Sequence, residues 1–117
     1  RATLEALAYQ VRDVFDAMGS TGVKLSSLRV DGGASANNLL MQIQADLLQV
    51  PIHRPVQLES TALGAAYLAG LGIGAWTMAD LNKLNPIASE FHPQLEREAD
   101  YTRWKKAVSA TIAFASN

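Results

Sequence analysis

Residues 28–38 read LRVDGGASANN. A short apolar run ends at Asp31, a glycine pair follows, and a segment able to form a helix begins directly after it. A strand that leads into the first turn of a helix presents free backbone N–H groups, and the partial positive charge at that end attracts phosphate. Gly32 and Gly33 carry no Cβ atoms, so a ligand can approach the backbone closely there. These residues favour a nucleotide-binding turn.

The same residues are also consistent with a purely structural turn in which Asp31 caps the helix, because Gly-Gly turns between a strand and a helix are common. In the nucleotide interpretation, the backbone N–H groups of Gly33 and Ala34 meet a phosphate oxygen. Asn37 and Asn38 then lie about one helical turn further on, within reach of a ribose or adenine edge. In open α/β sheets, ligands bind beyond the carboxyl ends of the strands, which is where this turn stands.

The composition is that of one small globular domain. The chain has 117 residues, of which 49% are hydrophobic, a net charge of −1 and no cysteine. The absence of cysteine excludes disulfides and thiolate sites, and the low net charge argues against nucleic acid as a partner. No uncharged run reaches the length of a bilayer, so membrane insertion is not expected and a cytoplasmic location is the default. Because the chain begins inside a helical pattern without methionine, we expect it to be part of a longer protein.

Hydrophobic periodicity, caps and breakers predict five helices and two strands. The helices are expected at residues 4–18, 36–48, from 61 or 62 to 71, 78–84 and 96–114, and the strands at residues 28–31 and 51–55. This alternation predicts an α/β fold with helices on both faces of a short parallel sheet. Two strands do not make a self-sufficient sheet, so further strands are expected upstream of Arg1.

Particular residues refine these expectations. Gly19 is placed at the end of the first helix, and Ser35 is the expected N-cap of the second. The third helix carries no charge and many small residues, which predicts burial on most sides. Pro51 and Pro55 favour an edge or strand-end position for the second strand. The side chains expected to pack inward are Leu4, Leu7, Ala8, Val11, Val14, Phe15 and Met18 in the first helix, Leu39, Leu40, Ile43 and Leu47 in the second, and Tyr101, Trp104, Val108 and Ile112 in the last.

Other candidate sites are weaker. The glycines at 70, 72 and 74 follow a helix rather than a strand, which indicates helix packing and termination instead of a dinucleotide loop. His53 and His92 lack partners at metal-ligand spacing, so no metal site is expected. The acidic residues at 96, 98 and 100 indicate a solvated helix start. One tryptophan followed by two lysines at 104–106 is a poor case for nucleic-acid binding.

Several segments resemble one known family. Residues 30–42, VDGGASANNLLMQ, look like the adenosine-binding segment of the FGGY carbohydrate kinases, in particular of the members that phosphorylate glycerol. Residues 61–71 are similar to the helix that follows in that family, and residues 1–5 look like the tail of a longer family signature. Residues 91–93 and 104–107 match as well, so the resemblance covers nearly the whole chain. One departure is Ser60, where the family has an apolar β-branched residue.

The resemblance implies a ribonuclease-H-like fold of the actin, Hsp70 and hexokinase superfamily. Residues 1–117 would form the latter part of the C-terminal domain, with the N-terminal domain and the start of the C-terminal domain absent. ATP or ADP would bind in the cleft between two such domains. The resemblance assigns nucleotide contacts to Gly33 and Ala34 through backbone N–H groups, with Gly32 making room, and adenosine contact to Asn37. Asp31 would hold the turn.

By the same resemblance, the full enzyme transfers the γ-phosphoryl group of Mg-ATP to glycerol and yields glycerol 3-phosphate. The carboxylate base, the glycerol pocket and the Mg²⁺ contacts would lie upstream, so this chain would hold no catalytic residue or metal ligand and would be inactive alone. The full enzyme would be a dimer or tetramer. Three alternatives stay open: an FGGY kinase for a pentulose or another polyol, a non-enzymatic nucleotide-binding module of the actin or Hsp70 type, and a piece that acts only by association.

Overall fold

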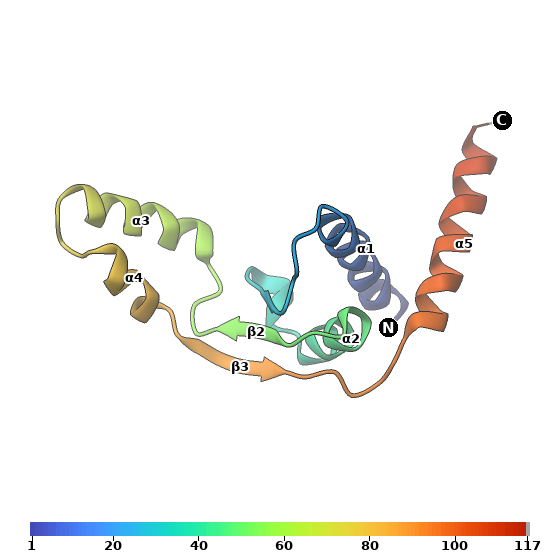
Figure 1. Cartoon of the computed structure of the whole chain (residues 1–117), viewed down its shortest axis with the longest axis horizontal. Helices are drawn as coiled ribbons and strands as arrows, with labels where there is room; N and C mark the ends of the chain where they lie inside the picture. Colours follow the sequence, from blue (N-terminus) through green and yellow to red (C-terminus); the bar gives the residue numbers. More distant parts are fainter. Residues whose placement is uncertain (117) are drawn as a thin grey trace.

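The computed structural model describes residues 1–116, with the backbone alone at residue 82. Five α-helices, one 3₁₀-helix and three strands follow one another along this part of the chain (Figure 1). Their bounds are α1 (Ala2–Gly19), β1 (Leu28–Arg29), η1 (Gly33–Ala36), α2 (Asn38–Leu48), β2 (Ile52–Pro55), α3 (Ser60–Gly72), α4 (Met78–Leu84), β3 (Ile87–Phe91) and α5 (Glu98–Ala115).

The sheet is mixed, which corrects the expectation of a parallel one. β1 pairs with β2 in parallel, Leu28 opposite Ile52, whereas β2 and β3 are antiparallel, with His53 opposite Glu90. β3 was not predicted, because Pro86 directly before it interrupts the periodic pattern of the sequence. β2 is therefore central rather than at an edge. Its prolines do lie at the strand ends, and the register shifts at Pro55, where the missing N–H is tolerated.

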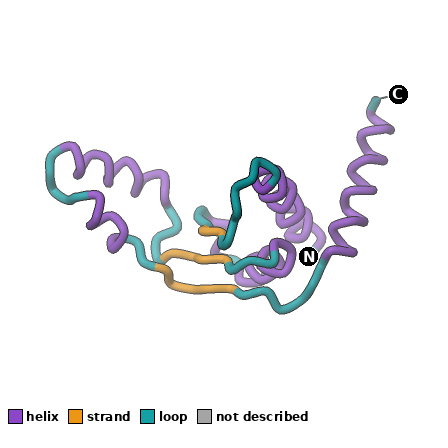
Figure 2. The backbone as a smooth tube through the Cα atoms, viewed as in Figure 1, coloured by secondary structure: helices purple, strands orange, loops and turns teal. Residues whose placement is uncertain are grey.

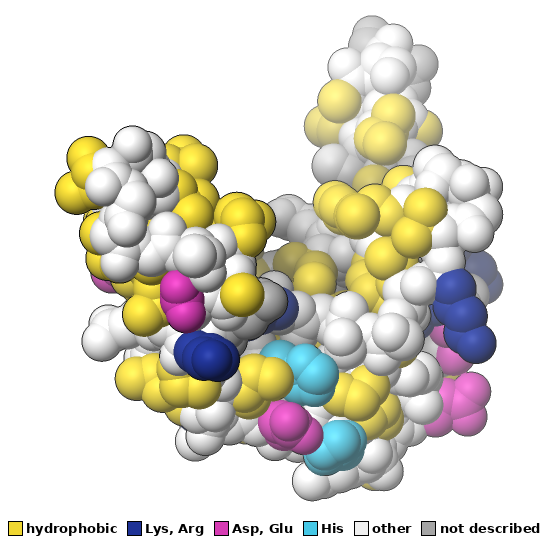
Figure 3. Space-filling view, turned by 60° about the vertical axis from the view of Figure 1, so that its left-hand side comes forward, with side chains coloured by type: hydrophobic (Ala, Val, Ile, Leu, Met, Phe, Trp, Pro, Cys, Tyr) yellow, Lys and Arg dark blue, Asp and Glu magenta, His cyan; other side chains and the backbone are white. Residues whose placement is uncertain are grey.

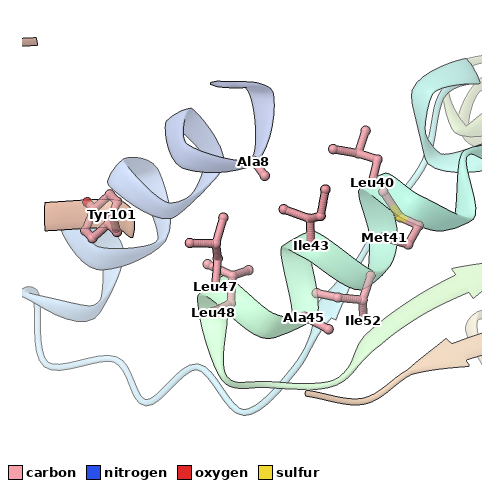
Figure 4. Close-up of a cluster of buried hydrophobic side chains, with 9 residues drawn as sticks. All are labelled: Ala8, Leu40, Met41, Ile43, Ala45, Leu47, Leu48, Ile52 and Tyr101. Atoms are coloured by element: carbon pink, nitrogen blue, oxygen red, sulfur yellow. The ribbon is translucent and has the colours of Figure 1, made fainter. Parts of the chain in front are cut away.

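The core forms around α2. Helix α1 packs on one side of α2, and α2 contacts β2 and β3. Ile43 and Leu47 of α2 and Ile52 of β2 are the largest fully buried side chains (Figure 4). Leu40 is buried as expected, but Leu39 is 53% exposed, in the first turn of α2 directly after the break from η1. The apolar face of α1 is only partly covered: Ala8 is buried, whereas Val14 is 59% exposed.

The α3–α4 hairpin corrects a second expectation. Helix α3 does form over the expected residues, but Gly70 is its only buried residue, and Leu68 is 72% exposed. The hairpin extends beyond one end of the strands, away from the core (Figure 2), and apolar side chains spread over its surface (Figure 3). Helix α3 has no charged residue, yet it is not buried among the residues that the structure describes.

The connection between α3 and α4 packs on α3 through Trp76. The Trp76 indole N–H donates to the Tyr67 carbonyl at 2.9 Å, and the two rings meet edge to face with centroids 6.3 Å apart. The same ring covers Gly70, where a Cβ atom would lie 2.0 Å from it. Helix α3 ends at Gly72, and Gly74 has a φ of +69°. This confirms the expected role of these glycines in packing and termination.

Helix α5 is attached through its first half. The Tyr101 hydroxyl donates to Asp13 Oδ1 of α1 at 2.5 Å, and the Trp104 ring stacks on Tyr9 with centroids 5.3 Å apart. Further along, Val108 is half-buried and Ile112 is 61% exposed, so the expected packing face ends about halfway along the helix.

The segment between β3 and α5 is held by a buried carboxylate of α2. Asp46, 2% exposed, accepts hydrogen bonds from the backbone N–H groups of Gln94 and Leu95 at 2.8 and 3.2 Å. The Gln42 side-chain amide donates to the same oxygen at 2.9 Å, and the Arg97 guanidinium lies 3.7 Å from the other. A buried carboxylate is stable only when it is paired in this way.

Candidate functional site

The turn after β1 has a conformation that requires glycine at one of its two glycine positions. Gly32 has a φ of +75° and a ψ of 167°, a backbone conformation that side-chain-bearing residues rarely adopt. Its N–H donates to the Leu58 carbonyl at 2.7 Å, which ties the turn to the segment after β2. The two glycines, expected to act as a pair, therefore differ: the backbone conformation requires glycine at position 32 but not at position 33.

Gly33 begins the 3₁₀-helix η1. The backbone N–H groups of Gly33 and Ala34 stand at the start of this helix. The Ser35 N–H donates to the Gly32 carbonyl at 3.1 Å, which closes the first turn. The N–H groups of Gly33 and Ala34 precede that bond, and the first N–H groups of a helix have no intrahelical acceptor. Gly33 and Ala34 are exposed, and a Cβ atom built on Gly32 or Gly33 would meet nothing within 4 Å. The turn therefore offers open space beside N–H groups that have no intrahelical acceptor.

Asn37, not Ser35, caps α2, which corrects the expected cap. Asn37 is extended, with φ −81° and ψ 108°, and its side-chain oxygen accepts from the Leu40 N–H at 3.1 Å. The Ser35 hydroxyl is turned the other way and donates to the Gly32 carbonyl at 2.7 Å. The expected single helix over residues 36–48 is thus two helices, η1 and α2, separated at Asn37.

Asp31 does not cap the helix. The Asp31 side chain is exposed, η1 has no side-chain cap, and among residues 1–116 the Asp31 carboxylate has no hydrogen-bond or ion-pair partner. Asp31 lies on the border of two cavities. One, of about 470 Å³, is shared with α3 and includes Tyr67; the other, of about 420 Å³, is mostly apolar and lies between α1, β1 and α2. Of the predicted nucleotide contacts, Ala34 alone lines one of these two cavities.

The sequence analysis missed Arg54, which contacts the turn from β2. Its Nη1 atom lies 3.1 Å from the Ser35 carbonyl, 3.3 Å from the Ala36 carbonyl and 2.7 Å from Asn38 Oδ1. Asn38, expected near a ribose or adenine, therefore has its side-chain oxygen occupied. No local sequence pattern predicts the contacts between Arg54 and the turn, because the residues in contact are 16 or more positions apart.

The two histidines, expected to be isolated, both face Glu90. His92 Nε2 lies 3.4 Å from one Glu90 carboxylate oxygen and His53 Nε2 lies 4.0 Å from the other, at a place where Figure 3 shows both rings beside an acidic side chain. Within residues 1–116, these and the other His, Asp and Glu side chains form no group of three with the geometry to hold a metal. Nor does any described helix have the length and apolar character needed to cross a membrane.

Comparison with known proteins gives a family for this fold. The model of the FGGY family of carbohydrate kinases, C-terminal domain, matches residues 1–73. The glycerol kinase of Caldanaerobacter subterraneus subsp. tengcongensis is 54% identical over 120 residues, which cover 98% of this chain and 24% of that protein. The glycerol kinase of Vibrio cholerae serotype O1 is 53% identical with the same coverage. The chain thus spans about a quarter of the length of the curated relatives it matches.

Solved structures confirm the α/β, ribonuclease-H-like fold class. The crystal structure of Plasmodium falciparum glycerol kinase with ADP has a TM-score of 0.79 at 36% identity, covering 95% of this chain and 23% of that one. The xylulose kinase of Rhodospirillum rubrum has a TM-score of 0.73 at 27% identity, covering 97% of this chain and 24% of that one.

Proposed function

Because the chain belongs to the FGGY family of carbohydrate kinases, we propose that it supplies the nucleotide-binding turn of an ATP-dependent glycerol kinase. In this proposal, the N–H groups of Gly33 and Ala34 bind a phosphate of ATP or ADP. Gly32 shapes the turn and leaves room for the ligand, and Asn37 contacts the adenosine. These residues, with the rest of the chain, are the C-terminal part of the enzyme.

The observation that carries the proposal is the turn itself. Gly33 and Ala34 present N–H groups without intrahelical acceptors at an exposed helix start, next to two glycines with open space on their Cβ side. Backbone donors at a helix start suit an anionic phosphate group. The relative with the TM-score of 0.79 was crystallised with ADP, which supports a nucleotide as the ligand.

The proposed reaction is transfer of the γ-phosphoryl group of ATP to a primary hydroxyl of glycerol. Such transfer depends on positioning and on charge stabilisation, with a carboxylate that takes up the hydroxyl proton. We place that carboxylate, the glycerol pocket and the Mg²⁺ contacts outside residues 1–117. Bound Mg²⁺ would neutralise charge on the phosphates.

Glycerol is favoured over a pentulose by the relatives. Curated relatives at 53 and 54% identity are named glycerol kinase, and the glycerol kinase structure is more similar in sequence than the xylulose kinase structure, at 36% against 27%. We further propose a cytoplasmic enzyme that assembles as a dimer or tetramer and binds neither nucleic acid nor membrane. The apolar surface of α3 supports association with further polypeptide.

Titration of the chain with ADP, followed by two-dimensional amide NMR, tests the nucleotide site. Shift changes concentrated at residues 32–38 are expected. Gly33→Ala is the sharpest variant, because the fold has space for the added methyl group and Gly33 needs no positive φ. It is expected to weaken ADP binding about tenfold, or about 1.4 kcal/mol, without lowering stability. Gly19→Ala, which also has open space, is the matched control with unchanged binding. ADP shifts located elsewhere would overturn the assignment.

A chimera tests the enzyme context. Residues 1–117 replace the matching quarter of the Vibrio cholerae glycerol kinase, and glycerol phosphorylation is measured. The proposal expects a chimera that phosphorylates glycerol, with a KM for ATP that rises in the Gly33→Ala version. A folded chimera that still binds glycerol but has lost ATP binding would contradict it. The isolated chain is expected to show no phosphorylation.

A further inference from the structure

We propose that Arg54 is a positioning residue that holds residues 32–38 in the shape that receives nucleotide. The inference rests on the proposed function, since it concerns the same turn. Arg54 lies on β2, the central strand, and its half-buried side chain reaches across to the junction between η1 and α2. It therefore connects the turn to the most firmly paired part of the sheet.

The contacts of Arg54 replace hydrogen bonds that a continuous helix would make. In such a helix the carbonyls of Ser35 and Ala36 would accept from the N–H groups four residues later, those of Leu39 and Leu40. In the structure, the Leu40 N–H donates to the Asn37 side chain instead, and the two carbonyls accept from Arg54. The guanidinium thus supplies donors where the helical ladder is broken.

This break decides how the candidate nucleotide contacts are oriented. Because the ladder is interrupted, Asn37 stays extended and η1 keeps its own axis, with Gly33 and Ala34 at its exposed start. Without a cation at this place, the two carbonyls would be left without partners, and the competing arrangement, a regular helix from residue 36 onward, would satisfy them. Formation of that helix would turn Asn37 into a helical conformation and displace the N–H groups of η1.

Arg54 is itself fixed on its far side. Its Nη2 atom donates to the Ser89 hydroxyl of β3 at 3.2 Å, and the guanidinium lies over the Phe91 ring, 5.0 Å from the centroid. The remaining partner is Asn38 Oδ1 at 2.7 Å. A planar guanidinium makes all of these contacts at once, whereas a lysine ammonium has no plane to stack on the ring and a narrower spread of donors.

Arg54→Met and Arg54→Lys test the inference, with Arg29→Met as the control. Arg29 is an exposed arginine on the neighbouring strand β1 that donates to the Asn85 carbonyl and does not touch the turn. For each variant we would measure the ADP dissociation constant, amide exchange at residues 35–40 and the urea midpoint. Arg54→Met is expected to weaken ADP binding about tenfold and to slow amide exchange at Leu39, whose N–H would join the regular helix. Arg54→Lys is expected to show both effects partially, and Arg29→Met to stay within about twofold of wild type.

In the chimera with the Vibrio cholerae enzyme, Arg54→Met is expected to raise the KM for ATP and leave the KM for glycerol unchanged. A general loss of folding would not produce that split. If Arg54→Met does not fold, Asn38→Ala, which keeps the arginine and removes one acceptor, carries the test together with Arg54→Lys. ADP affinity equal to wild type in these variants overturns the role of Arg54. Absence of ATP binding by the folded chimera that carries the wild-type residues overturns the proposed function instead.

Discussion

Helices α2 and α3 are both rich in apolar residues, yet their surroundings differ. Eight of the eleven residues of α2 are buried, including Gln44 and Asp46, whereas Gly70 is the only buried residue among the thirteen of α3. The more polar helix is thus the one inside the core. Burial here follows from position between α1 and the sheet, with each buried polar group paired. Apolar composition alone does not predict it.

The largest expected effect comes from the same substitution made in both helices. Leu47 of α2 is 1% exposed and Leu68 of α3 is 72% exposed. Leu47→Ala leaves a cavity in the core and is expected to cost about 3 kcal/mol of unfolding free energy, whereas Leu68→Ala is expected to cost less than about 0.5 kcal/mol. Urea unfolding measures both. Equal costs would mean that the apolar surface of α3 is covered in solution.

The difference between α2 and α3 also shows what the sequence can predict. The positions of all five α-helices and of two strands follow from periodicity, caps and proline, because these are local properties of the chain. The exposure of α3, the antiparallel pairing of β3 and the contacts of Arg54 depend on residues far away in the sequence, so no local pattern predicts them. At the candidate site, Gly32, Gly33 and Ala34 have the expected backbone arrangement, while their binding of nucleotide stays a prediction.

A smaller effect is expected inside the α3–α4 hairpin, where packing is local. Gly70→Ala places a Cβ atom 2.0 Å from the Trp76 ring, so the indole has to move. We expect a loss of about 1–3 kcal/mol confined to the hairpin, visible as a shift of the indole N–H resonance and faster amide exchange in α3. Gly64→Ala on the same helix meets open space and serves as the control, with unchanged or slightly raised helix stability. An unmoved Trp76 resonance in Gly70→Ala would contradict the packing.

High pH is expected to lower the stability of the core, to which Tyr101 belongs. Burial raises the pKa of the Tyr101 phenol well above its usual value of 10.0, and its hydrogen bond to Asp13 raises it further. The folded state therefore keeps this proton more tightly than the unfolded chain, so the stabilisation is complete below pH 10 and is lost as the pH rises beyond it. Tyr101→Phe is expected to cost about 1 kcal/mol near neutral pH.

The stability cost of Tyr101→Phe is expected to shrink as the pH rises above the usual tyrosine pKa, because the wild-type protein loses the stabilisation from its Tyr101 proton there. Urea unfolding at about pH 7 and about pH 11 measures the difference between the two proteins. Tyr9→Phe provides a comparison, since burial also raises the pKa of Tyr9, although that ring is only half-buried. A difference that stays constant with pH would show that the phenol does not titrate with folding.

Low pH acts on the hairpin, with the smallest expected effect. Asp80 forms a capping box with Thr77 at the start of α4, and hydrogen bonds from the Thr77 backbone N–H and hydroxyl lower the pKa of the Asp80 carboxyl below its usual 3.8. The stabilisation is present above pH 3.8 and is lost as the pH falls through the lowered value. Asp80→Asn is expected to remove this pH dependence from amide exchange in α4, with exchange in α2 as the internal reference. Unaltered pH dependence would rule out the capping role.

Helix α2 also has a mechanical consequence. Its first cap, Asn37, belongs to the candidate site, and its last cap, Gln49, donates through its side-chain amide to the Leu95 carbonyl at 2.9 Å. Between them the helix is about 16 Å long and tightly packed along its length. A helix of this kind moves as one rigid body. A displacement of Asn37 would therefore be carried by α2 to the Leu95 carbonyl, in the segment that leads into α5.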